Sequence, residues 1–233
     1  MKTLDSRFHG NDALELKVAF INKLYLTFLN MNIYQYDESL RKKGFLRVAG
    51  IDEAGRGTLA GPVVAAAVIM PEGIKIERLR DSKKVPEKER ELLFYKIRSS
   101  SAYIGIGIVG PEEIDRLNIL RATKLSMKLA VEDLPVSPDI LIIDAVSLPS
   151  IPIKQLSPVK GESISASVAA ASIIAKVTRD KIMLDYHHEY PNYNFKKNKG
   201  YSTREHLEIL QLHGPCPIHR KSFHGVMSLE LSF

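Results

Sequence analysis

This chain of 233 residues contains one cysteine and no tryptophan. The only cysteine, Cys216, has no second thiol to pair with, so an internal disulfide is excluded and nothing indicates an oxidising compartment. Because tryptophan is absent, any stacking against a ligand must use tyrosine or phenylalanine. The sequence also contains no internal repeat and no low-complexity tract.

A long hydrophobic run is missing as well. The most apolar early stretch, residues 18–29, contains Lys23 and is too short to cross a bilayer. Asp5, Asp12 and Glu15 precede it and no small-residue cleavage pattern follows it, which argues against a signal peptide. We therefore expect a cytoplasmic protein without a membrane partner.

The composition describes one globular domain. Hydrophobic residues make up 45% of the chain and charged residues 26%, which is enough for a single buried core. The 33 Lys and Arg exceed the 27 Asp and Glu, so the formal net charge is +6. A basic balance favours a polyanionic partner, although many basic proteins bind no nucleic acid.

Apolar runs and turn residues predict an α/β fold, a mixed sheet flanked by helices with a basic C-terminal helical segment. Strands are expected over residues 46–51, 62–70, 102–109, 140–143 and 153–156. Helices are expected over 36–43, 86–98, from Pro111 to about Val131, over 163–188 and, in the last forty residues, only around 203–213. Residues 1–30 are expected to form a poorly ordered extension, and residues 31–233 the folded domain.

Acidic residues stand where the predicted strands end. Asp52 and Glu53 follow the first strand, Asp144 follows the fourth, and Glu162 immediately precedes the long helix. Carboxyl ends of strands are where α/β sheets place their sites. Neighbouring strand residues face opposite ways, so Asp52 and Glu53 share a site only if the chain bends, which Gly55 and Gly57 make easy.

Four converging carboxylates would repel one another without a cation between them. No His or Cys lies near these acids in the sequence, so Mg²⁺ or Mn²⁺ is favoured over zinc. Taken singly, an Asp-Glu pair or a Gly-Arg-Gly is usually a turn, and a helix rich in alanine usually serves packing alone.

Several motifs together resemble bacterial ribonuclease HII, in the order of that family and over roughly 200 residues from Leu46 onward. They are AGIDEAGRG at 49–57, LAGPVVAAAVI at 59–69, RDSKKV at 80–85, LIIDAV at 141–146, VKGE at 159–162, AAASIIAKVTRD at 169–180, NKGYSTREHL at 198–207 and GPCPIHRKSF at 214–223.

The resemblance implies a ribonuclease H-like fold in which Asp52, Glu53, Asp144 and Glu162 bind two Mn²⁺ or Mg²⁺ ions. It also implies that the 2′-hydroxyl at an RNA–DNA junction, the group that separates RNA from DNA, is recognised by a small set of residues. These are Gly55, Arg56, Gly57 and Tyr201, while Lys83, Lys84 and Lys199 contact phosphates and Asp180 is structural.

The implied activity is endonucleolytic hydrolysis of RNA in RNA/DNA hybrids, and cleavage 5′ of ribonucleotides embedded in duplex DNA, leaving 3′-hydroxyl and 5′-phosphate ends. Its implied biological roles are removal of misincorporated ribonucleotides and of replication primers. The implied partners are hybrid duplexes and ribonucleotide-containing DNA, and the expected state is a monomer.

Three positions depart from the family pattern. Glu162 replaces the usual Asp, Thr58 replaces a usual Pro, and His224-Gly225 replaces a small residue followed by Pro. One alternative is therefore a hybrid-binding protein that has lost a metal ligand, and another is a different metal-dependent nuclease or phosphatase of the same fold. Ribonuclease HIII is a weaker resemblance, because its Asp-Glu-Ser-Gly-Lys-Gly signature is absent.

The first thirty residues lie outside the resemblance, which resumes near Met31 with MNIYQYDESLRKKGF. Met31 is thus a candidate start of the protein. A chain beginning at Met31 is expected to match the full chain in melting temperature and activity, because the upstream charges nearly cancel. A large drop in melting temperature on truncation would show that the segment packs on the core.

Overall fold

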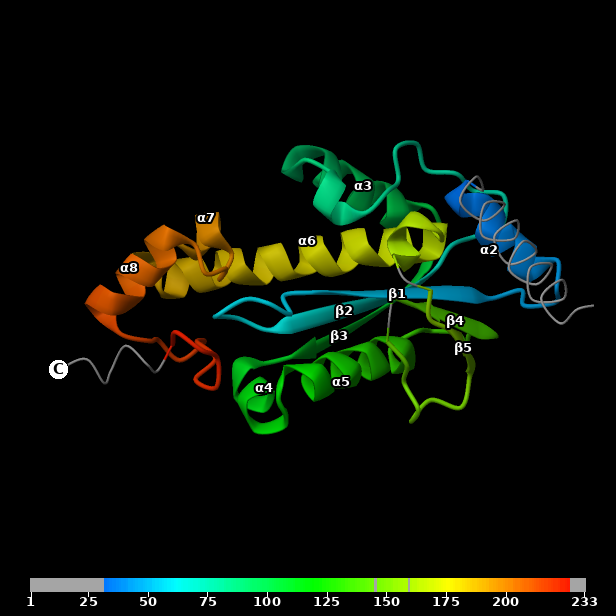
Figure 1. Ribbon diagram of the computed structural model, residues 1–233. Coiled ribbons are helices and arrows are strands. Elements are labelled where there is room, and N and C mark those ends of the chain that lie inside the picture. The colour runs from blue at the N-terminus through cyan, green and yellow to red at the C-terminus, as the bar shows by residue number, and fades with distance from the viewer. Residues whose placement is uncertain (1–31, 145, 159, 227–233) are drawn as a thin grey trace, which may run out of the picture.

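The protein is a three-layer α/β structure in which helices cover both faces of one sheet (Figure 1). The computed structural model describes residues 32–144, 146–158 and 160–226. The expectations for residues 1–30 lie outside this part and stay predictions. No helix in the described part is long and apolar enough to cross a membrane.

The sheet has five strands in the order β3-β2-β1-β4-β5. β1, β2 and β3 form an antiparallel meander, whereas β4 runs parallel to β1 and β5 runs parallel to β4. The strand bounds are β1 Val48–Ala54, β2 Val63–Ile69, β3 Tyr103–Val109, β4 Ile140–Ile143 and β5 Lys154–Leu156. The predicted mixed sheet is therefore confirmed, with β1 at its centre.

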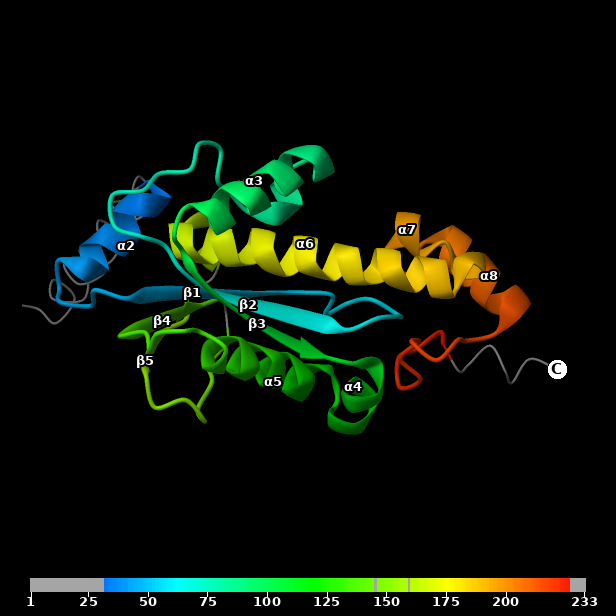
Figure 2. The same cartoon turned by 180° about the vertical axis from the view of Figure 1, so that it is seen from behind.

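One face of the sheet carries α6 and α3, and the other carries α5 and α4 (Figure 1). α2 lies near the beginning of β1, and α7 and α8 lie near the opposite end of the molecule, as Figure 2 shows from behind. The helix bounds are α2 Ile33–Arg41, α3 Glu87–Ser99, α4 Pro111–Leu117, α5 Ile119–Glu132, α6 Ala166–Glu189, α7 Phe195–Asn198 and α8 Arg204–His213.

Three predicted elements differ from the structure. The single helix expected from Pro111 is two helices, because Asn118 has φ +70° and caps α5 through a hydrogen bond from Arg121 N. A further short helix, α7, precedes α8 where only one helix was expected. β1 runs on to Ala54, so it contains Asp52 and Glu53 instead of ending before them.

The side chains of β2 point alternately into two cores, one on each face of the sheet, which explains why the whole strand is buried. Ala66 and Val68 contact the α6 side, whereas Ala65, Ala67 and Ile69 contact the α5 side. Small side chains on both surfaces bring α6 unusually close to the sheet. A Cβ on Gly50 would lie 2.1 Å from Ser167 C and from Val168 N, so the helix backbone occupies the space of a side chain.

Gly50→Ala is expected to destabilise the protein by about 3 kcal/mol or more, because the clash is with backbone that no rotamer change relieves. Gly110→Ala is the matched control, since a Cβ there meets nothing within 4 Å. As Gly110 is the N-cap of α4, the control should lose about 1 kcal/mol or less. Urea unfolding measures both, and equal losses would contradict the close approach of α6.

Candidate active site

Asp52, Glu53 and Asp144 lie near one another where β4 ends beside the longer strand β1. β4 ends at Ile143, the parallel partner of Ile51, so Asp144 follows beside Asp52 while β1 continues past it. The prediction that an acid directly follows its strand is correct for Asp144 and wrong for Asp52 and Glu53. Because β4 stops there, Asp52 and Glu53 have no neighbouring strand among the described residues on the β4 side of β1. This edge of β1 is therefore accessible from both faces of the sheet.

Asp52 points toward α6. It accepts a hydrogen bond from the Glu53 amide at 2.8 Å, and the nearby Ser172 hydroxyl of that helix also lowers its pKa. Burial, and then the charge of Glu53, outweigh these effects and raise the pKa of the Asp52 carboxyl to about 7. A carboxylate that is this costly to ionise favours a nearby cation.

Glu53 lies next in the strand and is largely buried. Burial raises the pKa of its carboxyl, the Arg56 guanidinium lowers it and the Asp144 charge raises it again, with a net increase. Arg56 Nη1 lies 3.8 Å from Glu53 Oε1. The expected bend at Gly55 is present, with φ +91°, but it follows both acids and does not turn them onto one face.

Glu162 lies in a short 3₁₀ turn, Gly161–Ser163, and α6 begins only at Ala166 with Ser165 as its N-cap. The Gly161 amide donates to Asp144 Oδ1 at 3.0 Å, which ties this turn to the end of β4. Burial is the main cause that raises the pKa of the Glu162 carboxyl, and the Asp144 charge adds to it. Glu162 Oε2 is buried and has no hydrogen-bond partner among the described residues.

Lys83 is a second cation near these acids, besides Arg56. Burial lowers its pKa, but the charges of Asp52, Asp81, Glu162 and Glu53 outweigh that effect and raise it. Asp81 was not predicted as part of the site; it accepts a hydrogen bond from the Lys83 amide at 3.0 Å. The signal that pointed to it was its position in the RDSKKV motif.

The donor set fits a hard divalent cation. Its oxygens come from carboxylates, and Asp52, Glu53 and Glu162 all have raised pKa values, as expected for acids gathered without a compensating metal. The buried, unpartnered oxygen of Glu162 also fits. In the described part of the chain, however, no three His, Cys, Asp or Glu side chains already form a finished metal-binding group.

The Gly-Arg-Gly segment follows β1 directly, adjoining the acids. Arg56 and Gly57 are exposed, and within the described ranges their backbone N–H groups donate to no acceptor. Tyr201 is brought to this segment from a distant part of the sequence, because the Leu59 amide donates to Gly200 O at 2.8 Å. The Tyr201 ring is 41% exposed, with Lys176 Nζ 5.5 Å from its centroid.

The other two predicted lysines are arranged differently. Lys84 is exposed next to Lys83. Lys199 is half-buried, with φ +50°, and its Nζ lies 3.7 Å from Glu87 Oε1. Asp180 pairs with Lys176 at 2.7 Å and with Arg90 at 3.3 Å, as expected of a structural residue.

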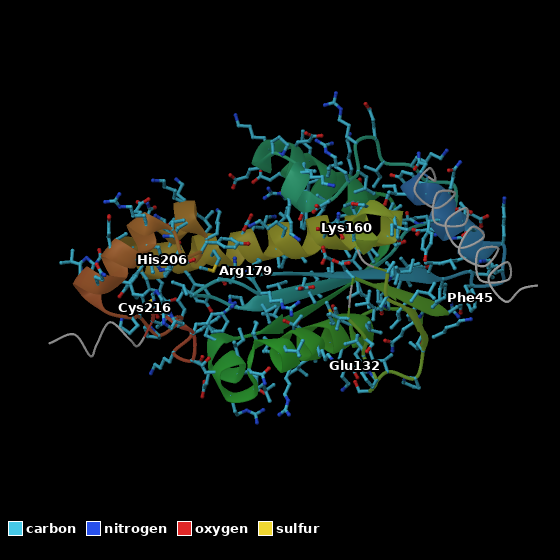
Figure 3. All side chains as sticks on the ribbon, in the orientation of Figure 1. Phe45, Glu132, Lys160, Arg179, His206 and Cys216 are labelled. Carbon is cyan, nitrogen blue, oxygen red and sulfur yellow. The ribbon has the colours of Figure 1, made fainter. Side chains whose placement is uncertain are left out.

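Four residues around the Gly-Arg-Gly segment were missed from the sequence. Arg179 and Arg220 are fully buried behind it, and His206 Nδ1 donates to Tyr201 O (2.8 Å) while its Nε2 shares a hydrogen bond with His219 Nε2 (3.1 Å). Figure 3 shows Arg179 and His206 toward the α7 and α8 end, away from Lys160 at the start of α6. Their only signal in the sequence was a place in the TRD, REHL and HRKSF motifs.

A mixed sheet with carboxylates at the split between two parallel strands, beside a basic glycine-rich segment, defines the class of ribonuclease H-like nucleases. The family model of Ribonuclease HII matches residues 49–226, most of the chain. The chain belongs to the ribonuclease HII family, and it is an endoribonuclease that acts on RNA/DNA hybrids.

Individual relatives agree. The chain is 54% identical over 188 residues to the Ribonuclease HII of Caldanaerobacter subterraneus subsp. tengcongensis, covering 81% of this chain and 78% of the relative. The ribonuclease H2 structure from Pyrococcus horikoshii OT3 is 28% identical with a TM-score of 0.69, covering 79% of this chain and 97% of its own. The Bst-RNase HIII structure in complex with Mn²⁺ shares the fold at 19% identity and TM-score 0.59, covering 79% and 69% of the two chains.

Ionisation of Asp52 should destabilise the metal-free protein. Its pKa rises from 3.8 in an unfolded chain to about 7 in the folded one, so stability is lost as pH rises from about 4 through 7. In EDTA at pH 8, Asp52→Asn should therefore gain on the order of 2–4 kcal/mol, with little gain at pH 4. Denaturant unfolding at both pH values measures this.

Asp139→Asn is the control, because hydrogen bonds from the Arg47 amide and side chain lower the pKa of Asp139. It should lose stability at pH 8. A stability of Asp52→Asn equal to the parent at pH 8 would mean that Asp52 is not a strained buried acid.

Proposed function

We propose that this site hydrolyses the phosphodiester on the 5′ side of a ribonucleotide, within a hybrid or a DNA duplex, and leaves 3′-hydroxyl and 5′-phosphate ends. The observation that carries the proposal is the continuity of two features in one short segment. The acids of β1 run directly into the Gly55–Gly57 turn, in which Arg56 and Gly57 are exposed, and Arg56 Nη1 lies 3.8 Å from Glu53 Oε1. A group recognised at the turn is thereby held next to the carboxylates.

Asp52, Glu53, Asp144 and Glu162 would hold two Mn²⁺ or Mg²⁺ ions. When bound, such ions lower the pKa of water, so that it attacks phosphorus, and stabilise the leaving oxygen. The protein contributes the fixed positions: the Glu53 amide donates to Asp52, and the Gly161 amide donates to Asp144. Glu162 is one methylene longer than the family's usual Asp, which favours the less demanding Mn²⁺ over Mg²⁺.

The Gly-Arg-Gly turn and Tyr201 would recognise the ribose. The free N–H groups of Arg56 and Gly57 can approach a sugar closely because glycine presents no side chain. Tyr201 offers an exposed ring for stacking on the adjacent sugar. A 2′-hydroxyl both donates and accepts hydrogen bonds, so this arrangement can distinguish RNA from DNA.

Lysines would provide phosphate contacts. Lys84 is exposed next to Lys83, and the chain carries a net charge of +6, which supports attraction to a duplex. Lys83 and Lys199 are proposed for the same role, although Lys83 faces the acids and Lys199 faces Glu87. These two side chains would have to exchange carboxylate partners for phosphates when substrate binds.

Single-turnover cleavage of a DNA duplex containing one ribonucleotide tests the proposal. Asp52→Asn should reduce the rate by about a thousandfold or more while leaving duplex binding nearly unchanged, because affinity comes mainly from phosphates. Tyr201→Ala should reduce the rate by about tenfold or more through lost stacking, and reduce binding to plain DNA much less. Tyr103→Ala is the control, as Tyr103 is similarly exposed, at 44%, on β3.

A hybrid-binding protein without activity would bind the duplex but cleave it in neither Mn²⁺ nor Mg²⁺. Substantial cleavage by Asp52→Asn would overturn the assignment of the acids. Equal losses of cleavage and of plain-DNA binding in Tyr201→Ala would assign that residue a folding role instead. Glu162→Ala cleaving like the parent in both metals would remove Glu162 from the site.

A further inference from the structure

Two fully buried arginines lie behind the Gly-Arg-Gly turn. Arg179 comes from α6 and Arg220 from the segment after α8, and both are 0% exposed. Within the described residues neither forms an ion pair with a carboxylate. Burial and then the Arg179 charge lower the pKa of Arg220 to about 9, so the two cations stay charged at neutral pH at a cost in stability.

Both guanidinium groups bind the same short loop, residues 55–62, almost entirely through its carbonyl oxygens. Arg220 donates to Gly55 O (2.6 Å), to Arg56 O (3.1 Å) and twice to Gly61 O (3.0 and 2.9 Å). Arg179 donates to Pro62 O (2.9 Å) and to Ala60 O (3.0 Å) from the other side. The loop carbonyls are therefore turned inward.

Arg179 also joins the loop to the Tyr201 segment. Its Nη1 donates to Lys199 O at 2.9 Å, and its guanidinium carbon lies 5.9 Å from the Tyr201 ring centroid. The Leu59 amide donates to Gly200 O nearby, and a Cβ on Gly200 would lie 2.5 Å from Ala60 O. One buried side chain thus holds both parts of the proposed ribose reader at a fixed separation.

The glycines of the loop leave room for this arrangement. A Cβ on Gly55 would lie 2.0 Å from Arg179 Nε, and one on Gly61 would lie 2.3 Å from Met183 Sδ. Position 55 therefore has no room for a larger residue, because the Arg179 guanidinium fills the space that a Cβ would occupy. The φ of +91° is a second reason why glycine is required there. A Cβ on Gly57, in contrast, would meet nothing within 4 Å, so the space beside this residue is open.

We infer that Arg179 and Arg220 are positioning residues for recognition of the 2′-hydroxyl, an inference that rests on the proposed function. By drawing the carbonyls of Gly55 and Arg56 inward, the buried cations leave the Arg56 and Gly57 N–H groups facing outward without an internal acceptor. Their uncompensated charge also makes the outward face of the loop attractive to the oxygens of a ribose or phosphate.

Thr58 gives this loop a contact that a proline could not supply. Its hydroxyl accepts from Arg179 Nη2 at 2.9 Å and lies 3.1 Å from both Gly55 O and Ala60 O, to either of which it can donate. Thr58 is 0% exposed. Its hydroxyl therefore extends the positioning network from Arg179 to Gly55 by a link whose removal leaves the arginines in place.

The test is a ratio that a loss of folding would not change. Cleavage is measured on two duplexes that differ only at one sugar, which carries either a 2′-hydroxyl or a 2′-fluoro group. A correctly placed loop distinguishes them because fluorine cannot donate a hydrogen bond. Lower stability or weaker phosphate binding affects both substrates equally, whereas a displaced loop lowers the ratio of the two rates.

Thr58→Val should lower that ratio by about tenfold, since small displacements near reacting groups have large effects on rate. Thr123→Val is the matched control, because Thr123 is also 0% exposed but its hydroxyl has no partner among the described residues. The control should keep the ratio of the parent. Melting temperatures of both variants report any general loss of stability.

Arg179→Lys and Arg220→Lys should lower the ratio further, because lysine keeps the charge but cannot make several divergent hydrogen bonds at once. Arg41→Lys is their control, since Arg41 is a buried arginine that donates to Met70 O, near α2. If the arginine variants fail to fold, Thr58→Val alone decides the matter. A ratio within about twofold of the parent in Thr58→Val overturns the inference.

Tyr201→Ala separates this inference from the proposed function. If Tyr201→Ala lowers the ratio and Thr58→Val does not, the ribose reader stands and the positioning role is wrong. If neither changes the ratio although the parent distinguishes the two sugars, the proposed reader itself is wrong, and the positioning role fails with it.

Discussion

The close approach of α6 to the centre of the sheet is the constraint on which the site depends. Gly50 and the alanines of β2 and α6 remove side chains from the interface, and the helix backbone occupies the space where a Cβ of residue 50 would lie. Every α6 residue used in the site is placed by this contact. Ser172 reaches Asp52, and two turns further on Arg179 reaches the loop that follows β1.

Negative and positive charges lie close to one another along residues 52–62, with the acids at the beginning of this segment and two buried arginines behind the rest. Residues 52 and 53 carry acids whose pKa values are raised by burial and by a neighbouring carboxylate, and residues 55–62 lie over two buried cations. Within the described protein, Lys83 and Arg56 compensate the acids only in part, and the two buried cations form no ion pair with a carboxylate. A substrate that brings cations and a polar sugar edge would complement both, so the cost in stability is concentrated where binding can offset it.

Long-range contacts assemble the loop over those cations. His206 hydrogen-bonds to His219 and donates to Tyr201 O, in a cluster with Phe195 and Tyr193 that packs on the end of α6. Burial lowers the pKa of both imidazoles, to about 4 for His219, so the pair is neutral at physiological pH. The residues around α7 and α8 thus hold the Tyr201 backbone in place.

The sequence alone determined the class of the sheet and the places of its strands along the chain, and it indicated the acids and the glycine-rich turn as candidates, because apolar runs and local motifs carry that information. It did not determine the break at Asn118, the extension of β1 through Glu53, or the role of Thr58. Those features depend on partners far away in the chain: Arg179 is 121 residues from Thr58 and Arg220 is 165 from Gly55. A buried arginine and an exposed one are the same letter, and only the tertiary structure decided which carbonyls surround it.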